Sequence, residues 1–351
     1  MDTLVVGDRL IPHEAFRAAI ERELGGGFGP VRAVDWAAPP ERQHSMQQTM
    51  ETDGPEAVPT PDEVVAAAGE AELLVVHFAP VPLAVLEAAP RLAAVVVARA
   101  GVENVNLDGA SRRGVAVANV QGRNAAAVAE QALALLLAEV RDVARADAGI
   151  KAGGWPKEFA APAWELAGRT VAMVGFGHVA RQLARRLAGF GVRLLVFDPY
   201  VDRDTIDAHG GEKLTELDQA FREGDVVSLH ARLSAETRRF IGREQFALMK
   251  PTAYFVNTAR SRMVDHDALY QALAEHRIAG AGLDVHDQEP LPPDSPWRAL
   301  DNVTLSPHIA GATVEAREKS VRLVAEAVRE LAERGHTATV VNADAVALAR
   351  Q

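Results

Sequence analysis

Short apolar runs alternate with helix-like stretches along the first third of the chain. Runs rich in β-branched residues predict strands at 3–8, 31–36, 71–78, 92–101 and 114–119. Between them, periodic patterns predict helices at 12–24, where the glycines at 25–27 end the helix, and at 60–69. Strands that alternate with helices in this way form a parallel sheet with helices on its faces. The pattern therefore predicts the α/β class.

The same alternation starts again after an interruption. Residues 124–147 predict one long helix, and a loop containing Trp155 follows, where this side chain contacts a neighbouring subunit or packs inside its own. A second series of strands and helices begins near residue 168, and another long helix is expected at about 313–334. Residues 41–61 are polar and lack a clear period, so we expect a long surface loop there, either covering a cleft or simply solvated.

Composition narrows the classes of function. The 351 residues are too many for one ordinary core and suit two domains. A net charge of −11 argues against nucleic acid or an anionic membrane as a main partner, although a local basic pocket for a small anion remains compatible with it. The absence of cysteine rules out disulfides, thiol nucleophiles and cysteine-ligated metals. The first residues lack the features of a signal peptide and the apolar runs are too short to cross a bilayer, so we expect a cytoplasmic protein.

The stretch "VAMVGFGHVARQLARRLAGFGVRLLVFD" carries a dinucleotide-binding pattern. Gly175, Gly177 and Ala180 form G-x-G-x-x-A between a predicted strand and a predicted helix. The first glycine permits a tight turn, the second lets a pyrophosphate approach the backbone, and the alanine permits close packing of helix on strand. The helix would begin at His178 and Val179, whose N–H groups and positive dipole end would face the phosphates.

Asp198 stands at the end of the next predicted strand, about 20 positions further on. A carboxylate there accepts hydrogen bonds from the ribose hydroxyls and repels a 2′-phosphate, so the sequence favours NAD over NADP. The nearby Arg203 leaves NADP open.

Three later stretches place polar residues at the ends of predicted strands. These residues are Arg260 in "FVNTARSRMVDHDAL", Glu289 in "GAGLDVHDQEPL" and His308 in "LSPHIAG". A single histidine in a loop is ordinarily a surface residue. However, the carboxyl ends of parallel strands are where an open α/β sheet binds its ligands. The three residues together therefore suggest catalysis.

These stretches, together with "ARAGVENVNL" and "NAAAVAEQALALLLAEVR", resemble the D-isomer-specific 2-hydroxyacid dehydrogenase family, in family order and over nearly the whole chain. The resemblance implies that Arg260 binds the substrate carboxylate and carbonyl, and that His308 is the general acid–base. Glu289 would hold the His308 ring and stabilise its imidazolium. Hydride would pass directly to or from NAD, with no metal ion.

The resemblance implies further contacts with ligands. Thr258 and Asp284 are candidate cofactor-binding residues, and the backbone N–H groups near Gly101 and Val102 would hold the substrate carboxylate. Two arginines, Arg99 and Arg123, could bind a second anionic group such as a phosphate or a distal carboxylate. A surface arginine at a helix entry is the alternative for either of them.

The family fold implies two Rossmann-like or flavodoxin-like parallel-sheet domains. An NAD domain at 121–309 would be inserted into a discontinuous substrate domain made of 1–120 and 310–351. The helix at 124–147 and the arm around 150–168 would form a homodimer interface. The expected activity is interconversion of a small anionic D-2-hydroxy acid and its 2-oxo acid. The alternatives are an NAD(H)-sensing corepressor-like binding protein and a phosphite-type dehydrogenase, since both keep the same three residues.

Overall fold

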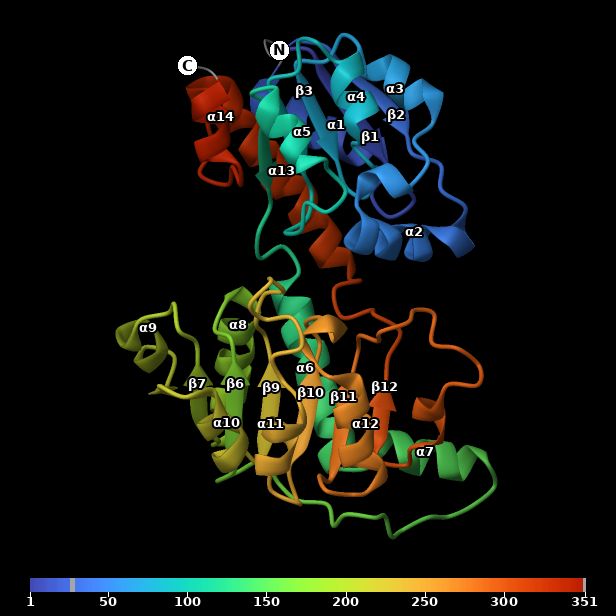
Figure 1. The fold of residues 1–351 in the computed structure, drawn as a ribbon, viewed down its shortest axis with the longest axis vertical. Helices are drawn as coiled ribbons and strands as arrows, with labels where there is room; N and C mark the ends of the chain where they lie inside the picture. The colour runs from blue at the N-terminus through green and yellow to red at the C-terminus, as the bar shows by residue number, and fades with distance from the viewer. Residues whose placement is uncertain (26–28, 350–351) are drawn as a thin grey trace. The chain divides into compact units, whose positions relative to one another are not determined.

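The computed structural model describes residues 1–25 and 29–349, and the chain in it divides into two compact units. Unit 1 comprises Met1–Arg123 together with the segment that starts at Val314, and unit 2 comprises Asn124–Thr313. Unit 1 is therefore discontinuous, with unit 2 inserted into it (Figure 1). This arrangement confirms the predicted fold class of two parallel-sheet α/β units.

Unit 1 is built on a five-stranded parallel sheet in the order β2-β1-β3-β4-β5. This is the order of flavodoxin-like folds. Its strands are β1 (Thr3–Gly7), β2 (Val31–Asp35), β3 (Leu73–Val76), β4 (Ala94–Val97) and β5 (Ala116–Asn119). Its helices are α1 (His13–Leu24), α2 (Pro40–Asp53), the 3₁₀ turn η2 (Pro55–Ala57), α3 (Asp62–Ala68), α4 (Leu83–Ala88), α5 (Leu107–Arg112), α13 (Val314–Arg334) and α14 (Ala343–Ala349).

The inner strands β1, β3 and β4 are buried and almost entirely apolar because both faces of the sheet are covered there, whereas the edge strand β2 is only partly buried. Leu4 and Val6 of β1 pack under α2 to α5, whereas Val5 between them packs against α1, α13 and α14. Successive side chains of a strand point to opposite faces, which explains this division. Helices from both ends of the chain therefore complete one core (Figure 1).

Unit 2 is built on a seven-stranded parallel sheet in the order β12-β11-β10-β9-β6-β7-β8. Its strands are β6 (Thr170–Val174), β7 (Arg193–Phe197), β8 (Gly211–Leu214), β9 (Val226–Leu229), β10 (Tyr254–Asn257), β11 (Gly280–Leu283) and β12 (Val303–Leu305). Its helices are α6 (Ala125–Val140), α7 (Val143–Lys151), α8 (His178–Leu187), α9 (Arg203–Asp207), α10 (Leu217–Glu223), α11 (Arg243–Leu248) and α12 (His266–Ala274). The 3₁₀ turns are η3 (Ala188–Phe190), η4 (Ser261–Met263) and η5 (Pro296–Ala299).

Two helical layers enclose the sheet of unit 2. Helices α6 and α8 cover one face, and α10, α11 and α12 cover the other (Figure 1). The strand order reverses between β9 and β7, with β6 in the middle. In doubly wound sheets the crevice at such a switch point is where a dinucleotide binds. The fold therefore places the glycine-rich turn after β6 at the expected point.

Two expectations about helices were wrong. Residues 41–61 are mostly helical, because α2 begins directly after Pro39 and continues to Gly54, which has a φ of 83°. The single long helix expected at 124–147 ends at Val140. The chain then passes through Asp142 in the left-handed region, with a φ of 53°, and α7 continues from Val143 to Lys151. Of the glycines expected to end the first helix, Gly25 follows α1 directly, and 26–27 lie outside the described residues.

None of the helices in the described part of the chain combines the length and apolar character that crossing a membrane requires.

Candidate active site

The carboxyl edge of the seven-stranded sheet collects most of the predicted site residues. Because all its strands are parallel, the residues that follow them lie along one edge of unit 2. In chain order these are Gly175 after β6, Asp198 after β7, Thr258 and Arg260 after β10, Asp284 after β11 and His308 after β12.

The turn between β6 and α8 has the geometry of a phosphate cradle. Gly175 has a φ of 93°, and a Cβ there would lie 2.5 Å from the backbone nitrogen of Ala231, so only glycine suits this position. A Cβ at Gly177 would meet nothing within 4 Å, so the space beside it is open to a ligand. No side chain caps α8, which begins at His178, and its first N–H groups are therefore available to an anion. The turn fits a dinucleotide pyrophosphate.

Asp198 accepts hydrogen bonds from the turn after β6 and from the turn after β7. Its Oδ2 accepts the backbone N–H of Phe176 at 2.7 Å, and its Oδ1 accepts the N–H groups of Tyr200 and Val201 at 2.8 and 3.1 Å. A carboxylate offers about four lone-pair sites, so hydrogen-bonding capacity remains for ribose hydroxyls. The sequence suggested only a ribose contact, and the structure adds the role of bracing the β6–α8 turn.

Thr258 and Asp284 are both buried but differ in their hydrogen bonding. The buried Oγ1 of Thr258 has no hydrogen-bond partner among the described residues, which fits a polar group supplied by a bound cofactor. Asp284 is 0% exposed, and its oxygens accept hydrogen bonds from Ser306 Oγ at 2.6 Å and from the N–H groups of Ile309 and Ala310 at 3.0 and 2.9 Å. Asp284 therefore braces the loop after β12, and its contact with a cofactor stays a prediction.

His308 and Glu289 form a hydrogen-bonded pair. The His308 Nδ1 lies 2.9 Å from Glu289 Oε2, and the other carboxylate oxygen, Oε1, accepts the backbone N–H of His286 at 2.8 Å. The side chain of Glu289 is 5% exposed and that of His308 is 29% exposed. The carboxylate is therefore fixed at both oxygens and orients a ring that stays accessible.

Arg260 leaves β10 in an extended conformation. The buried Asn257 shapes this turn, since its Oδ1 accepts the N–H of Ala259 at 2.9 Å and its Nδ2 donates to the carbonyl of Arg260 at 3.2 Å. Nη1 of Arg260 donates to the carbonyl of Ala259 at 2.8 Å. Sequence reasoning missed Asn257, although an asparagine at the end of an apolar strand is a signal for such a turn.

His230 is a further residue that sequence reasoning missed. It follows β9 on the same edge of the sheet, and its Nε2 lies 2.8 Å from Ser228 Oγ. Burial lowers the pKa of His230 to about 4, so the ring is neutral at ordinary pH. Among the described residues, no three histidine, aspartate or glutamate side chains are grouped to hold a metal ion.

The predicted substrate residues of unit 1 follow its strands in the same manner. Arg99, Gly101 and Val102 lie in the turn after β4, and Arg123 follows β5. Arg99 is almost buried, donates from Nη2 to Glu103 Oε2 at 2.6 Å, and stacks over the Phe78 ring at 4.8 Å. The binding roles of these residues stay predictions.

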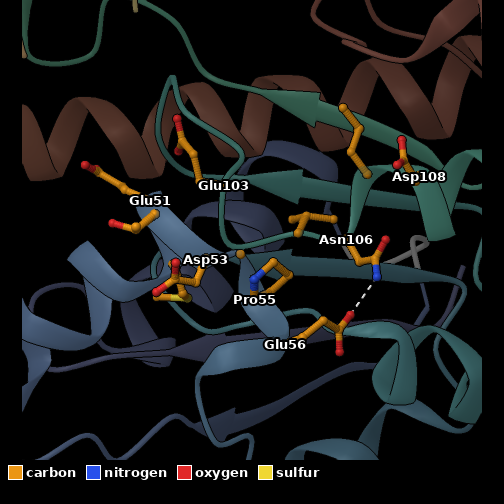
Figure 2. A pocket seen from close by; sticks show the side chains of 12 residues that line it. Glu51, Asp53, Pro55, Glu56, Glu103, Asn106 and Asp108 are labelled. Carbon is orange, nitrogen blue, oxygen red and sulfur yellow. Dashed lines mark hydrogen bonds between the residues drawn. The ribbon is translucent and has the colours of Figure 1, made fainter. Parts of the chain in front are cut away.

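An acidic cavity of about 420 Å³ also lies in unit 1. It is formed by the end of α2, by η2, by Glu103 and by residues 105–108, and Figure 2 shows the carboxylates around it. The acidic residues that line it are Glu51, Asp53, Glu56, Glu103 and Asp108. Within it, Asn106 Nδ2 donates to Glu56 Oε1 at 2.6 Å (Figure 2). No predicted site residue lines this cavity, and its charge disfavours an anionic ligand.

Comparisons with known proteins agree with this geometry. The family model described as "D-isomer specific 2-hydroxyacid dehydrogenase, NAD binding domain" matches residues 133–310. A glyoxylate reductase of Korarchaeum cryptofilum is 39% identical over 77% of this chain and 82% of its own length. A D-3-phosphoglycerate dehydrogenase of Methanocaldococcus jannaschii is 35% identical over 81% of this chain, which spans 54% of that protein.

A solved structure has the same fold over nearly the whole chain. The TT0316 protein of Thermus thermophilus has a TM-score of 0.76 at 29% identity, over 97% of this chain and 99% of that one. The matched family model covers the glycine-rich turn, Asp198, Arg260, Glu289 and His308. The predicted resemblance is thereby confirmed: the chain belongs to the D-isomer-specific 2-hydroxyacid dehydrogenase family and is an NAD-dependent oxidoreductase.

Proposed function

We propose that this protein interconverts a small D-2-hydroxy acid and its 2-oxo acid, with His308 as the general acid–base. The observation that carries the proposal is the 2.9 Å contact between His308 Nδ1 and Glu289 Oε2, on the same sheet edge as the Gly175–Gly177 cradle. A histidine oriented by a buried carboxylate is suited to moving one proton at a fixed point.

Proton transfer, stabilisation of the imidazolium and substrate binding are carried out by three different side chains. Because Nδ1 of His308 faces Glu289, its Nε2 is the nitrogen assigned to proton exchange with the substrate oxygen. In the reducing direction the imidazolium gives its proton to the carbonyl oxygen, and in the oxidising direction the neutral ring removes the hydroxyl proton. Glu289 stabilises the imidazolium electrostatically. Arg260 binds the substrate carboxylate and polarises the carbonyl, since a guanidinium keeps its charge and pairs with two oxygens.

Other residues of unit 2 would hold the cofactor. The open space at Gly177 and the N–H groups of His178 and Val179 would receive the pyrophosphate, Asp198 the adenosine ribose, and Thr258 a polar group through its unpaired Oγ1. When bound, NAD supplies the hydride acceptor, and its reduced form supplies the hydride. We propose that Asp198 makes NAD preferred over NADP, because a 2′-phosphate would lie beside its carboxylate.

Names of relatives suggest the range of substrates. They include a glyoxylate reductase and a 3-phosphoglycerate dehydrogenase, and this chain spans only about half the length of the latter. We infer a small 2-oxo acid as substrate, with its carboxylate also bound near the backbone of Gly101 and Val102. No observation favours the corepressor-like or the phosphite-oxidising alternative.

A homodimer is part of the proposal. The exposed side chains of Val143, Ile150 and Trp155 form an apolar arm on α7 and the segment after it. Several large apolar side chains exposed along one short segment commonly mark a protein interface. A second copy of the chain is the partner that we propose.

The test is oxidation of NADH by the purified protein with glyoxylate, hydroxypyruvate, phosphohydroxypyruvate and phosphonopyruvate. Turnover with at least one of them is expected. Tight binding of NADH without turnover of any 2-oxo acid would contradict the proposal and favour a binding protein. A preference for NADPH, measured as kcat/KM, would contradict the role given to Asp198.

A further inference from the structure

Four charged or titratable side chains meet at the carboxyl ends of the strands of unit 1. Asp8 follows β1, His77 follows β3, Arg99 follows β4 and Arg123 follows β5. The first three are almost completely buried, and Arg123 is partly buried. Parallel sheets bind ligands at this edge, so the group is a candidate binding site.

Asp8 and His77 form a buried hydrogen-bonded pair. Asp8 Oδ2 lies 2.9 Å from His77 Nδ1 and also accepts the N–H of Phe78 at 3.1 Å, while Oδ1 accepts the N–H groups of Leu10 and Ile11. Burial opposes the charge on Asp8, but these hydrogen bonds outweigh it and lower its pKa. With Nδ1 facing a carboxylate, the buried Nε2 of His77 has no hydrogen-bond partner among the described residues.

The charge of Arg99 is compensated within unit 1. Its Nη2 donates to Glu103 at 2.6 Å, its Nη1 lies 4.0 Å from Glu51 Oε1, and its guanidinium covers the Phe78 ring. Two carboxylates of its own chain therefore form ion pairs with Arg99. Of the two arginines that the sequence singled out, this one has the weaker case for a ligand anion.

Arg123 is compensated more weakly, since the carboxylate of Asp8 acts on it without forming an ion pair. None of the ion pairs found in the described residues includes it, and its Nη1 donates to the neutral Ser320 Oγ of α13 at 3.2 Å. A guanidinium has five N–H donors, and burying a cation without an opposite charge is costly. Burial, together with the charge of Arg99, lowers the pKa of Arg123 to about 10, and the carboxylate of Asp8 opposes this shift only in part. Arg123 also acts on His77, whose pKa burial lowers and the charges of Arg123 and Arg99 lower further. Arg123 therefore keeps the capacity to bind an anionic group of a ligand, because Asp8, the carboxylate that acts on it, is paired with His77.

We propose that Arg123 binds a second carboxylate of the substrate, and hence that the substrate is a dicarboxylic 2-oxo or 2-hydroxy acid. The inference rests on the proposed function and specifies its substrate class. A guanidinium fork can pair with two oxygens of either a carboxylate or a phosphate. A carboxylate fits better here because it carries only one negative charge. A second negative charge would meet the field of Asp8, Glu51 and Glu103, which already surround Arg99 and His77. His77 Nε2, as an acceptor, can bind a hydroxyl group or a water beside that carboxylate.

The experiment compares kcat/KM for NADH-dependent reduction of matched acids. Oxaloacetate is paired with pyruvate, 2-oxoglutarate with 2-oxovalerate, and phosphohydroxypyruvate is included for the phosphate. The full-length protein is compared with Arg123→Met, Arg123→Lys and the control Arg113→Met, which removes an exposed arginine of the same unit. Melting temperatures show whether each variant is folded.

We expect wild type and Arg113→Met to prefer dicarboxylic over matched monocarboxylic acids. In Arg123→Met this preference should fall by about 10- to 100-fold, the effect of one charge-assisted contact, and Arg123→Lys should keep part of it. A wild type without the preference, or an Arg123→Met that keeps it, would overturn the inference while leaving the proposed function intact. A dominant preference for the phosphorylated acid that Arg123→Met abolishes would overturn the choice of carboxylate. Failure to reduce any 2-oxo acid would instead count against the proposed function.

Discussion

His308 has a backbone conformation that is uncommon outside glycine. Its φ is 55°, directly after Pro307, and its N–H donates to the carbonyl of Ser306 at 3.1 Å. Left-handed conformations of larger residues persist where the surrounding structure determines them. Here the surroundings are Glu289 on the ring and Asp284 on the backbone of the two residues that follow. The histidine is therefore held on both its side chain and its loop.

The partly buried His230 gives a prediction about pH and stability. Its pKa in the folded protein is lowered to about 4 by burial, whereas a histidine of the unfolded chain titrates near 6.5. Between these values the unfolded chain binds a proton that the folded protein binds weakly. The contribution of His230 to the free energy of unfolding is therefore constant above pH ~6.5. As the pH drops from there towards 4, the free energy of unfolding falls by about 1–3 kcal/mol.

The measurement is denaturant unfolding across this pH range in wild type and His230→Gln. The variant should lose less stability on acidification, because glutamine does not titrate and can still hydrogen-bond Ser228. His336→Gln, which removes an exposed histidine, is the control and should behave like wild type. Parallel curves for wild type and His230→Gln would refute the assignment.

The turn between β6 and α8 contains two glycines that are needed for different reasons, one for folding and one for binding the cofactor. Gly175 needs its positive φ and has Ala231 against it, whereas Gly177 borders open space. Gly175→Ala should therefore destabilise the fold by about 1–3 kcal/mol or more, through strain and the clash. Gly177→Ala should leave the melting temperature nearly unchanged but raise the Kd for NADH, since its methyl group occupies the cradle. Equal effects of the two changes on stability and on NADH binding would contradict this distinction.

The loop after β12 depends on Asp284. Replacement by asparagine exchanges one acceptor oxygen for a donor NH₂, which cannot accept the N–H of Ile309 or Ala310. Asp284→Asn should therefore lower kcat by about tenfold or more, because His308 is misplaced. A raised Kd with an unchanged kcat would instead indicate a direct contact with the cofactor. Steady-state kinetics and NADH fluorescence titration separate the two.

Some elements were predictable from the sequence and others were not. The strands were, because parallel strands buried on both faces are continuous apolar runs. Helix α2 was missed, since it is polar along its length and Met50 is its buried apolar anchor, so it carries no clear period. Its local signals, Pro40 at its first position and Gly54 after it, were present in the sequence. The break at Asp142 depends on a left-handed conformation that no residue type announces.

Some residues of the candidate site were likewise predictable from the sequence, and others were not. Arg260, Glu289 and His308 could be singled out because their residue types and order carry the chemistry. The bracing role of Asp284 could not, because it depends on which backbone N–H groups the folded loop presents. Nor could the sequence separate Arg99 from Arg123, since the difference is the pairing of Arg99 with carboxylates of its own chain.

At the scale of the whole molecule, the exposed apolar arm predicts assembly. A buried packing role for Trp155 was one expectation, and it is wrong, because this side chain is 75% exposed. Val143 and Ile150 of α7 are 57% and 51% exposed, and α7 buries no residue. A helix that buries nothing in its own subunit is suited to an interface.

Trp155→Lys should weaken the homodimer. Interface tryptophans often contribute 2 kcal/mol or more, so the dimer Kd should rise by about 30-fold or more. Sedimentation velocity over a range of protein concentrations measures this. Tyr200→Lys, which changes an aromatic residue that is 92% exposed outside the arm, should leave the association unchanged. A wild type that is monomeric at micromolar concentration would contradict the proposed dimer.

The central claim is that His308 moves the proton in an NAD-dependent oxidation of a 2-hydroxy acid. The most direct measurement is the rate of NADH oxidation with the best 2-oxo acid in wild type and in His308→Gln, together with the Kd for NADH of both proteins. Glutamine can keep a hydrogen bond to Glu289 but cannot exchange a proton. We predict that kcat falls by about 10²- to 10⁴-fold while NADH binding is retained. A His308→Gln variant that turns over at the wild-type rate would contradict the account.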